Sequence, residues 1–573
     1  MKQMKKSIII FSLLAASGGV AMAQGAIDAY SISQPDLKGT ARFMGMAGAF
    51  GALGGDLSSI SQNPAGIGVY RSSDIGFTLD LDLQSSNSQA QGFKYDMNQT
   101  KFLLNNLGAV LTMRLPSTTF PNFNFGFTYN KGASFNRVYG GNINTLRNSM
   151  SNYIAGIANA NQLTEGDVAS GNDYDPYNPG YNDYASPWIT ILGYDSYLIS
   201  PDMNPSTGVT NWYGLWDDNS MTGQNTSGSG SFLMQEWGGT NDFNIVFGGN
   251  ISNVLYWGMN FDIVNINYRL SALWGESLDN ALVPAENNSF VRTTADWNLS
   301  NIYSVSGTGF NYQLGFILKP VQALRLGFAF HTPTWYNLNE EFGASVDYLY
   351  GGSESGYATV NNGYLGYNSY NLRTPWKIIA SAAGVIGNNL ILSFDYEWAN
   401  YGKMHFSEPT YYDNGWFDYY PYSLQNTGPV SYSGFLNPND PYAYENLDIS
   451  TYYKSTNTFR AGVEFKPTSS FSIRAGYANV SSPVRKEASG NQEIIYTSGT
   501  QPSYRFDNST NYISFGLGYR YKHVYVDLAY VYKHMDSEYH AYSPDPENPQ
   551  IPSPQSKLSF TNNQIVLSAG YRF

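Results

Sequence analysis

The residues of this sequence that could carry out catalysis are few, and they form no familiar constellation. The five histidines never occur as His-x-x-x-His or His-Glu-x-x-His, the spacings that direct two imidazoles to one metal ion. No Gly-x-Ser-x-Gly nucleophile elbow is present. The absence of cysteine excludes disulfides and thiolate metal sites. His331 and His405, near predicted strand ends, are the only candidates for a hydrolytic site, and a histidine at an interface is the simpler interpretation. We therefore expect no enzyme, no metal and no cofactor.

A second set of reactive groups is a series of acids and arginines that alternate with large apolar residues. From Asp74 to Leu83 the odd positions are Ile, Phe or Leu, and the even positions are polar or glycine. This period of two predicts a strand with one apolar face. Buried charges need partners, so we expect ion pairs that hold a plug, with a charge-selective pore as the alternative. The charged candidates for a lumen are Asp80, Asp82, Arg325, Asp395, Glu397, Arg460, Glu464, Arg474, Arg520 and Arg572.

The composition indicates what the apolar faces contact. Aromatic residues make up 16% of the chain and charged residues only 13%, against about 25% charged in a typical soluble domain. The net charge of −13 disfavours nucleic acid as a partner. After the N-terminal segment no apolar run is long enough for a transmembrane helix. A membrane-like composition without such helices favours a closed β-barrel, in which every backbone group is paired.

The alternating segments predict an all-β protein, a transmembrane antiparallel barrel of about fourteen strands. Short connections alternate with long ones, as periplasmic turns alternate with extracellular loops, so both termini are expected in the periplasm. The barrel and its loops occupy 73–573. The predicted strands lie near 73–84, 105–115, 121–131, 240–251, 254–273, 302–319, 322–347, 371–386, 388–408, 450–467, 469–486, 505–521, 523–537 and 557–573. The predicted long loops are 85–104, 132–239, 274–301, 348–370, 409–449, 487–504 and 538–556.

Two segments precede the barrel. Residues 1–23 combine lysines, a short apolar run and Ala21-Met22-Ala23, which predicts a secretory signal peptide. Residues 24–72 are rich in glycine, poor in charge and end near Asn63-Pro64-Ala65-Gly66. We interpret them as a small plug inside the barrel, held by few interactions.

The longest loop, 132–239, has a helix-like beginning at 143–163 and an Asp-rich stretch beyond it. Asp173, Asp175 and Asp183 could supply oxygen ligands to Ca²⁺. The EF-hand spacing is absent, however, and solvated Asx-turns are the simpler interpretation.

In this order of parts the chain resembles the FadL-type outer-membrane transporters of long-chain fatty acids and other hydrophobic compounds. The resemblance is carried by Asn63-Pro64-Ala65-Gly66 between plug and first strand, by the Lys-Pro turn at Phe316–Pro320, and by the aromatic end at Phe573. It implies a hatch inside a fourteen-stranded barrel, ligand capture by extracellular loops, an apolar lumenal site and lateral exit near a kinked third strand. That strand would be Phe123–Asn130, where no Gly-Pro kink signature is present.

The resemblance also implies a setting and partners. Tyr571 and Phe573 would form the signal read by the barrel assembly machinery of a Gram-negative outer membrane. A monomer in contact with outer-membrane lipid and lipopolysaccharide, with a fatty-acid-like ligand and plug-gated release, is the expected state. Two alternatives remain open: another pore or receptor, such as a haem-binding or porin-like barrel, and an adhesin or structural barrel.

Overall fold

The structure is a computed structural model. It describes residues 25–34, 36–171, 174–178, 186–203, 210–217, 225–285, 289–387, 389–409, 440–486, 488 and 499–573. The predicted signal peptide, 1–23, lies outside the described residues. Within these ranges no helix combines the length and the apolar character needed to cross a membrane.

The wall is one antiparallel sheet that closes on itself. Its last strand, β21 (Gln555–Arg572), pairs with its first, β1 (Asp74–Ala90), from Asp74–Arg572 to Gln89–Lys557. Counted over the described residues, the ring has fourteen positions, which confirms the predicted barrel. In order they are β1, β2 (Phe93–Arg114), β3 (Asn122–Ser134) with β4 (Arg137–Ile143), β7 (Ser227–Ile251), β8 (Leu255–Ala285), β9 (Ser289–Val321), β10 (Leu324–His331) with β11 (Trp335–Tyr350), β13 (Gly366–Arg373) with β14 (Lys377–Ile386), β15 (Leu390–Asn400) with β16 (His405–Ser407), β17 (Ser455–Phe465), β18 (Phe471–Val480), β19 (Tyr504–Tyr521), β20 (Val524–His540) and β21.

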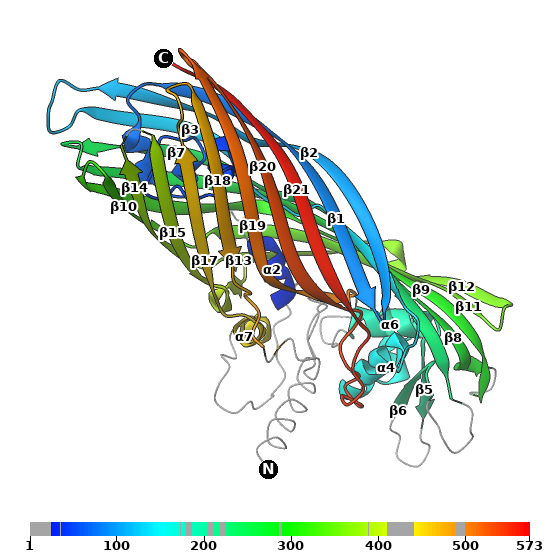
Figure 1. The fold of residues 1–573 in the computed structure, drawn as a ribbon. Helices are drawn as coiled ribbons and strands as arrows, with labels where there is room; N and C mark the ends of the chain where they lie inside the picture. The colour runs from blue at the N-terminus through cyan, green and yellow to red at the C-terminus, as the bar shows by residue number, and fades with distance from the viewer. Residues whose placement is uncertain are drawn as a thin grey trace, which may run out of the picture.

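The other elements lie inside the ring or at its ends (Figure 1). The plug contains α2 (Ala26–Ser33), α3 (Ala41–Met44) and the 3₁₀ turns η1 (Ser59–Ser61) and η2 (Pro64–Val69). The connections contain α4 (Met150–Ala160), α5 (Glu165–Val168), α6 (Trp188–Asp195), the hairpin β5 (Ile199–Met203) and β6 (Thr210–Gly214), β12 (Glu354–Thr359), η4 (Val360–Gly363), η5 (Tyr401–Lys403) and α7 (Ala443–Tyr452).

An apolar belt surrounds the end of the barrel that carries the short turns. In β1, Ile75 and Phe77 point outward and are about half exposed, whereas Asp80 on the opposite face is fully buried. About nine to eleven tilted residues suffice to span a bilayer core as a strand. Further outward members are Leu107, Leu111, Phe125, Phe127, Ile245, Ile263, Leu314, Leu326, Phe394, Phe459, Ile473, Phe515, Leu517, Leu528 and Leu567.

The upper edge of the belt is marked by a repeated cross-strand pair. An outward tyrosine on one strand donates its hydroxyl to an outward asparagine on the next. Tyrosines and tryptophans favour the membrane interface, where the ring is apolar and the hydroxyl wet. The four pairs are Tyr129–Asn241 at 2.9 Å, Tyr396–Asn457 at 2.7 Å, Tyr477–Asn511 at 3.0 Å and Tyr530–Asn563 at 2.6 Å. We expect the contact with lipid to end at the level of these Tyr–Asn pairs.

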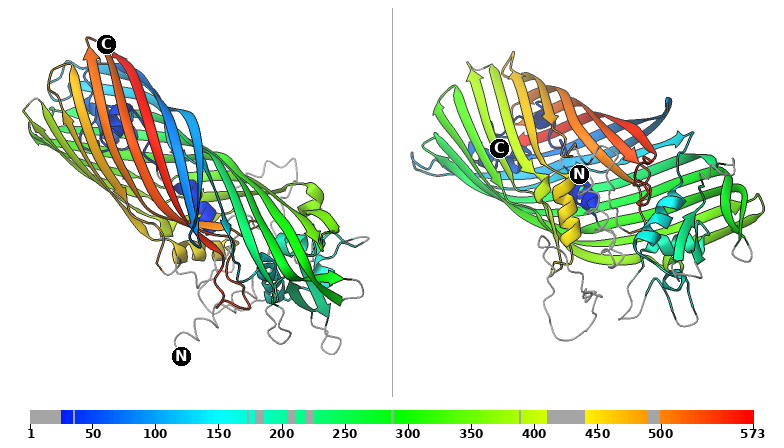
Figure 2. Two further views of the ribbon diagram at one scale, coloured as in Figure 1. Left: turned by 45° about the vertical axis from the view of Figure 1, so that its right-hand side comes forward. Right: turned by 90° about the horizontal axis from the view of Figure 1, so that it is seen from below.

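Above this level one side of the wall continues as a tall sheet, and its polarity is reversed. In β8 the outward residues are apolar as far as Ile263, but Asn267 and Ser277 beyond it are exposed and polar. The inward residues change in the opposite sense, from buried Asp262 to buried Trp274. Figure 1 and Figure 2 show β8, β9, β11 and β12 extending beyond the shorter strands of the other side. The inner face of this tall wall is therefore mainly apolar, and its outer face along β8 is polar.

Several predicted loops are parts of this wall. The stretch 85–104 is strand on both sides of a turn at Gln91-Gly92, and 132–239 contains β4, α4–α6, β5, β6 and the start of β7. Only the helix-like segment at 143–163 overlaps an element of the predicted kind, α4. The loop prediction is wrong here because the strands continue with Asn, Ser, Gly and Tyr and, in β7 and β8, with the apolar phase reversed.

The two described ends of the chain lie at opposite ends of the barrel. Helix α2 lies beside α7, at the end with the long connections, whereas Phe573 lies at the end with the short turns (Figure 1). The prediction that both termini lie on one side is thus not met by the described chain. The reason is that the plug runs through the lumen from one end to the other before it joins β1.

Candidate functional site: the plug and the split wall

The plug backbone presses against the wall where the wall strands carry glycine. A Cβ atom at Gly258 or Gly315 would overlap the carbonyl oxygen of Pro64 or the side-chain oxygen of Asn63. Glycine allows such close approach because it has no side chain. The same relation holds for Gly327 with Gly51 and for Gly462 and Gly476 with Met46, whereas a Cβ at Gly516 would lie in tight contact with Gly45 at 3.3 Å.

The predicted Asn63–Gly66 motif lies at the centre of these contacts. The Asn63 side chain accepts a hydrogen bond from the Ala65 amide at 3.1 Å and so begins the turn η2. Pro64 follows at the first helical position, where its missing N–H costs nothing. The Asn63 amide also donates to the carbonyl of Gly51 at 2.6 Å and to that of Phe316 in β9 at 3.3 Å.

Charged side chains add a second set of ties. Arg42 of the plug reaches Glu464 of β17 at 3.0 Å. The Glu464 carboxylate also binds Arg474 at 2.7 Å, and Arg474 binds Asp527 at 2.5 Å. These groups are buried, and each is paired, as buried charges require.

On the same side of the lumen, Asp395 accepts hydrogen bonds from the Gly51 amide at 2.9 Å and from Gln62 at 3.1 Å. Beside it, Arg460 binds Glu397 at 2.8 Å. His331 lies against the Gln62 carbonyl at 3.0 Å. It is therefore a wall contact of the plug.

Of the remaining charged candidates, two make contacts at the wall and one is exposed. Arg325 donates to the Leu53 carbonyl at 2.8 Å, and Arg572 pairs with Asp74 at 3.0 Å. Arg520 lies exposed near the end of β19, beyond the plug. The expectation that few interactions hold the plug is wrong. The plug has few charged side chains, but Arg42 is paired with Glu464, and the backbone of Gly51 and Leu53 binds side chains of the wall.

The wall is split beside the third strand. The β2–β3 ladder ends at Asn106–Asn130, although β2 begins at Phe93. Beyond that pair β3 is interrupted before β4, and the amide of Phe135 in this break binds the carbonyl of Gly238 at 3.2 Å. Gly238 has a φ of 115°, a value that glycine accommodates. A bend is thus present where the sequence offered no Gly-Pro signature.

Past the bend, β4 lies on the lumen side of β1. Two inward serines of β1 bind its backbone: Ser86 donates to the carbonyl of Val138 at 2.5 Å, and Ser88 donates to that of Gly140. Strands β2 and β4 are therefore not paired with each other. A pocket of about 110 Å³ lies between the hairpin and β4; its lining includes Phe93, Tyr95 and Gly141. We call the unpaired stretch between β2 (93–105) and β4 the side split.

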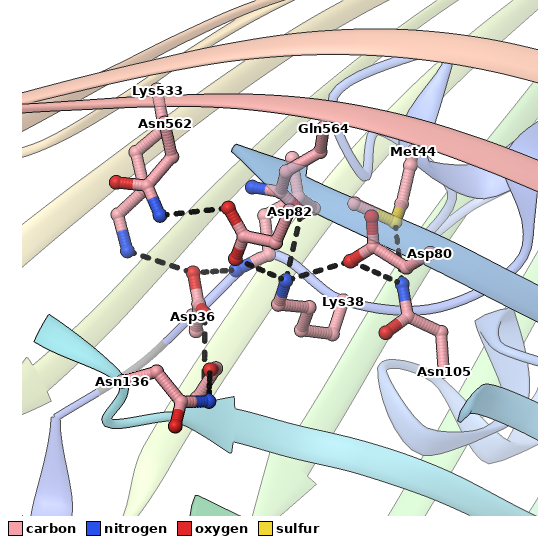
Figure 3. Close-up of polar contacts among 12 residues, drawn as sticks. Asp36, Lys38, Met44, Asp80, Asp82, Asn105, Asn136, Lys533, Asn562 and Gln564 are labelled. Atoms are coloured by element: carbon pink, nitrogen blue, oxygen red, sulfur yellow. Dashed lines mark hydrogen bonds and ion pairs between the residues drawn. The ribbon is translucent and has the colours of Figure 1, made fainter. Parts of the chain in front are cut away.

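A cluster of buried charges lies at the lumenal side of the side split (Figure 3). Lys38 of the plug binds Asp80 at 2.8 Å, Asp82 at 3.4 Å and Gln564 at 2.8 Å. Two residues earlier, Asp36 binds Lys533 at 2.9 Å and faces the amide of Ser134 at 3.4 Å. The cluster also includes Asn105, which donates to Asp80 at 3.1 Å, and Asn562, which donates to Asp82 at 3.0 Å. Asp80 and Asp82 were predicted; Asp36 and Lys38 were missed, because single charges in a glycine-rich segment have no period.

The inner face of the tall wall and α2 form one apolar cluster, which we call the upper chamber. Ala26, Ala29 and Ile32 of α2 are buried in it. Tyr30 stacks on Tyr453 at 5.1 Å between ring centres. Its aromatic members also include Tyr139, Trp188, Trp212, Phe232, Tyr268, Trp274, Trp297, Tyr303, Phe342, Tyr370, Tyr401 and Phe406.

One carboxyl group of the plug lies in the upper chamber. Burial raises the pKa of the Asp28 carboxyl to about 7, because the apolar surroundings disfavour its charged form. The amide of Gly25 donates to it at 2.9 Å and opposes that shift only in part.

The described residues offer no metal site: no group of three His, Cys, Asp or Glu side chains is placed to hold an ion. Of the Asp-rich stretch, Asp173 and Asp183 lie outside the described residues. Asp175 accepts from the Tyr177 amide at 3.0 Å, the geometry of an Asx-turn.

Comparison with known proteins gives likeness at the level of structure. No family model and no curated protein matches the sequence. A Pseudomonas aeruginosa FadL homologue has 13% identity and a TM-score of 0.48, with 94% of this chain and 99% of that chain covered. The Pseudomonas putida toluene transporter TodX has 13% identity and a TM-score of 0.43 at the same coverage. The Ralstonia pickettii toluene transporter TbuX has 12% identity and a TM-score of 0.43, with 94% and 98% covered.

Proposed function

We propose that this chain is an outer-membrane channel through which hydrophobic molecules such as long-chain fatty acids pass. A molecule enters the upper chamber from the medium, moves along the plug and leaves sideways through the side split into the membrane. The plug blocks a straight aqueous path because it contacts the wall on opposite sides of the barrel, at Gly258 and Gly315 on one side and at Gly462 and Gly476 on the other.

The observation that carries this proposal is the reversed polarity of the tall wall. An apolar inner face above the lipid belt has no lipid to cover it, so it needs either chain or ligand in contact with it. Burial there is favourable for any apolar solute, by about 25 cal/mol per Å² removed from water. The inner face of the tall wall and the segments packed on it are apolar and lie next to the plug, which supports passage of hydrophobic rather than polar molecules.

The orientation belongs to the same proposal. The end with the tall wall faces the medium, and the end with the short turns and Phe573 faces the periplasm, as is usual for such barrels. The backbone of Phe573 pairs with Ser73 in both directions at 3.0 Å. We therefore place the assembly signal Tyr571–Phe573 where the last strand closes the ring. Contact with lipopolysaccharide and a monomeric state complete the proposal.

The test is uptake by intact cells that lack their own route for hydrophobic compounds. Cells with matched surface levels of this chain or an empty vector are given labelled oleate, labelled toluene and a labelled sugar. We expect faster uptake of at least one of the first two and no change for the sugar. Toluene is included because TodX and TbuX are toluene transporters.

Two neighbouring substitutions in β11 serve as test and control. Leu338 is buried in the upper chamber, whereas Asn337 points outward and is exposed. Leu338→Asn should lower hydrophobic uptake several-fold, since it places an unpaired amide on the path. Asn337→Ser should leave it unchanged. Sugar uptake without oleate or toluene uptake would make the chain a polar pore, and surface binding without uptake an adhesin.

A further inference from the structure

The segment Asp36–Lys38 lies where the plug crosses the inner side of the side split, and its charges reach both sides. On one side of the split, Lys38 binds Asp80 of β1 at 2.8 Å, and Asp80 binds Asn105 of β2 at 3.1 Å. On the other side, Asp36 faces the amide of Ser134 in β3 at 3.4 Å. The plug thus ties together two parts of the wall that do not pair with each other.

We propose that Asp36 and Lys38 form a latch that holds the plug across the side split, and that sideways passage requires this latch to open. The inference rests on the proposed function, because it concerns how the exit of that path is closed. It goes beyond that function in assigning the closure to the contacts of two plug residues, which are Lys38–Asp80 and Asp36–Lys533 on the β1 side of the split and Asp36–Ser134 on the β3 side.

The chemistry of the cluster suits a closure that can open. The side chains of Lys38, Asp80 and Asp82 are at most 8% exposed, so water does not weaken their ion pairs while the split is closed. The cluster contains three acids, Asp36, Asp80 and Asp82, and two lysines, Lys38 and Lys533. One carboxylate is therefore in excess and shares the Lys38 ammonium group. When the split opens, entering water can solvate the excess carboxylate. Opening therefore does not leave that charge without a hydrogen-bonding partner.

A neighbouring hydrogen bond joins the plug to β4 at a point closer to α2. Gln34 accepts a hydrogen bond from Arg137 at the start of β4. Arg137 and Arg505 both bind Glu236 of β7, the latter at 2.6 Å. The plug is therefore bound to the β4 side of the split just before the latch begins. A shift of α2 in the upper chamber would be passed directly to Asp36 and Lys38.

The experiment uses two charge-balanced variants and a matched control. The first is Asp36→Ala with Lys533→Met, and the second is Lys38→Met with Asp80→Asn. Each removes one acid and one base, so the net charge of the cluster is kept. The control is Arg42→Met with Glu464→Gln, which removes a buried plug–wall pair on β17. Since β17 lies across the ring from the side split, the control loosens the plug without touching the latch.

The readout is a single cysteine, Asn136→Cys, placed at the split in a chain that has no other cysteine. Asn136 donates to Ser134 at 2.9 Å and is half-buried. Its reaction rate with a maleimide is measured in vesicles after heat-modified mobility has shown that the barrel is formed. Both latch variants should react about tenfold faster or more, since a charged hydrogen bond contributes about 1.5–3 kcal/mol. The control should react at the parent rate.

Each other result overturns the latch. Equal rates in the parent and both latch variants would mean that these ion pairs do not close the split. Equal acceleration in the control would mean that the whole plug loosens at once. Failure of both latch variants to form a heat-resistant barrel, where the control forms one, would make the cluster a folding element. Uptake of oleate and toluene is measured in the same cells. If no chain takes up oleate or toluene, the proposed function is wrong, but the labelling result still stands.

Discussion

Single side chains in the plug have two duties at once, local capping and contact with the wall. Asn63 is the clearest case, because its oxygen caps η2 while its amide group binds the carbonyl of Gly51. Removing both hydrogen bonds should loosen the plug locally. Removing only one should show which of the two contributes more to holding the plug. The structure supplies the variants for that separation.

We predict that Asn63→Ala loosens the plug, because it removes the cap, worth about 1 kcal/mol, and leaves the Gly51 carbonyl without its donor. Asn63→Ser keeps an oxygen for the Ala65 amide but is too short to donate to the Gly51 carbonyl. Hydrogen exchange of residues 48–66 should therefore be fastest in Asn63→Ala and intermediate in Asn63→Ser. Barrel formation should be the same in all three chains. Parent-like exchange in Asn63→Ala would remove this residue from any gating role.

Among the elements, α2 is the one whose position bears most on the path. It is eight residues long and has only Ala26, Ala29 and Ile32 fully buried. A helix this short is marginal alone, so its place in the upper chamber depends on tertiary contacts. Asp28 is the one acid in its sequence, and it faces that chamber uncharged at low pH.

We predict that α2 is held less firmly as the pH rises. The pKa of Asp28 is raised from 3.8 to about 7 by burial, so the folded state binds its proton more tightly than the unfolded chain. The resulting stabilisation is fully present below about pH 4 and is lost as the pH rises to about 7. Protection factors for residues 26–33 should therefore be higher at pH 5 than at pH 8. Asp28→Asn should remove the difference. A pH effect of the same size in Asp28→Asn would assign it to another group.

At the scale of the whole molecule, the lipid-facing half could be predicted from sequence and the rest could not. The belt strands alternate strictly because lipid and lumen impose opposite demands on successive residues, as at Ile75–Leu83. The tall wall follows the same period, but beyond Ile263 its apolar phase is reversed because water replaces lipid outside. In the sequence alone, a strand with this reversed pattern resembles a polar loop. The ion pairs of Glu464 with Arg42 and of Asp80 with Lys38 join residues hundreds or tens of positions apart, which no local pattern can pair.

The same reversal predicts how high the barrel stands above the membrane. Single cysteines are placed along the outward face of β8 at Phe261, Ile263, Arg269 and Ser277, all exposed in the barrel. Arg269→Cys and Ser277→Cys lie above the level of the Tyr–Asn pairs. A membrane-impermeant maleimide added to intact cells should label them. Phe261→Cys and Ile263→Cys lie in the belt and should react only with a lipid-soluble reagent. Labelling of Arg269→Cys and Ser277→Cys only after the outer membrane is opened would place the tall wall in the periplasm. The upper chamber would then face the cell interior, and the proposed direction of passage would be reversed.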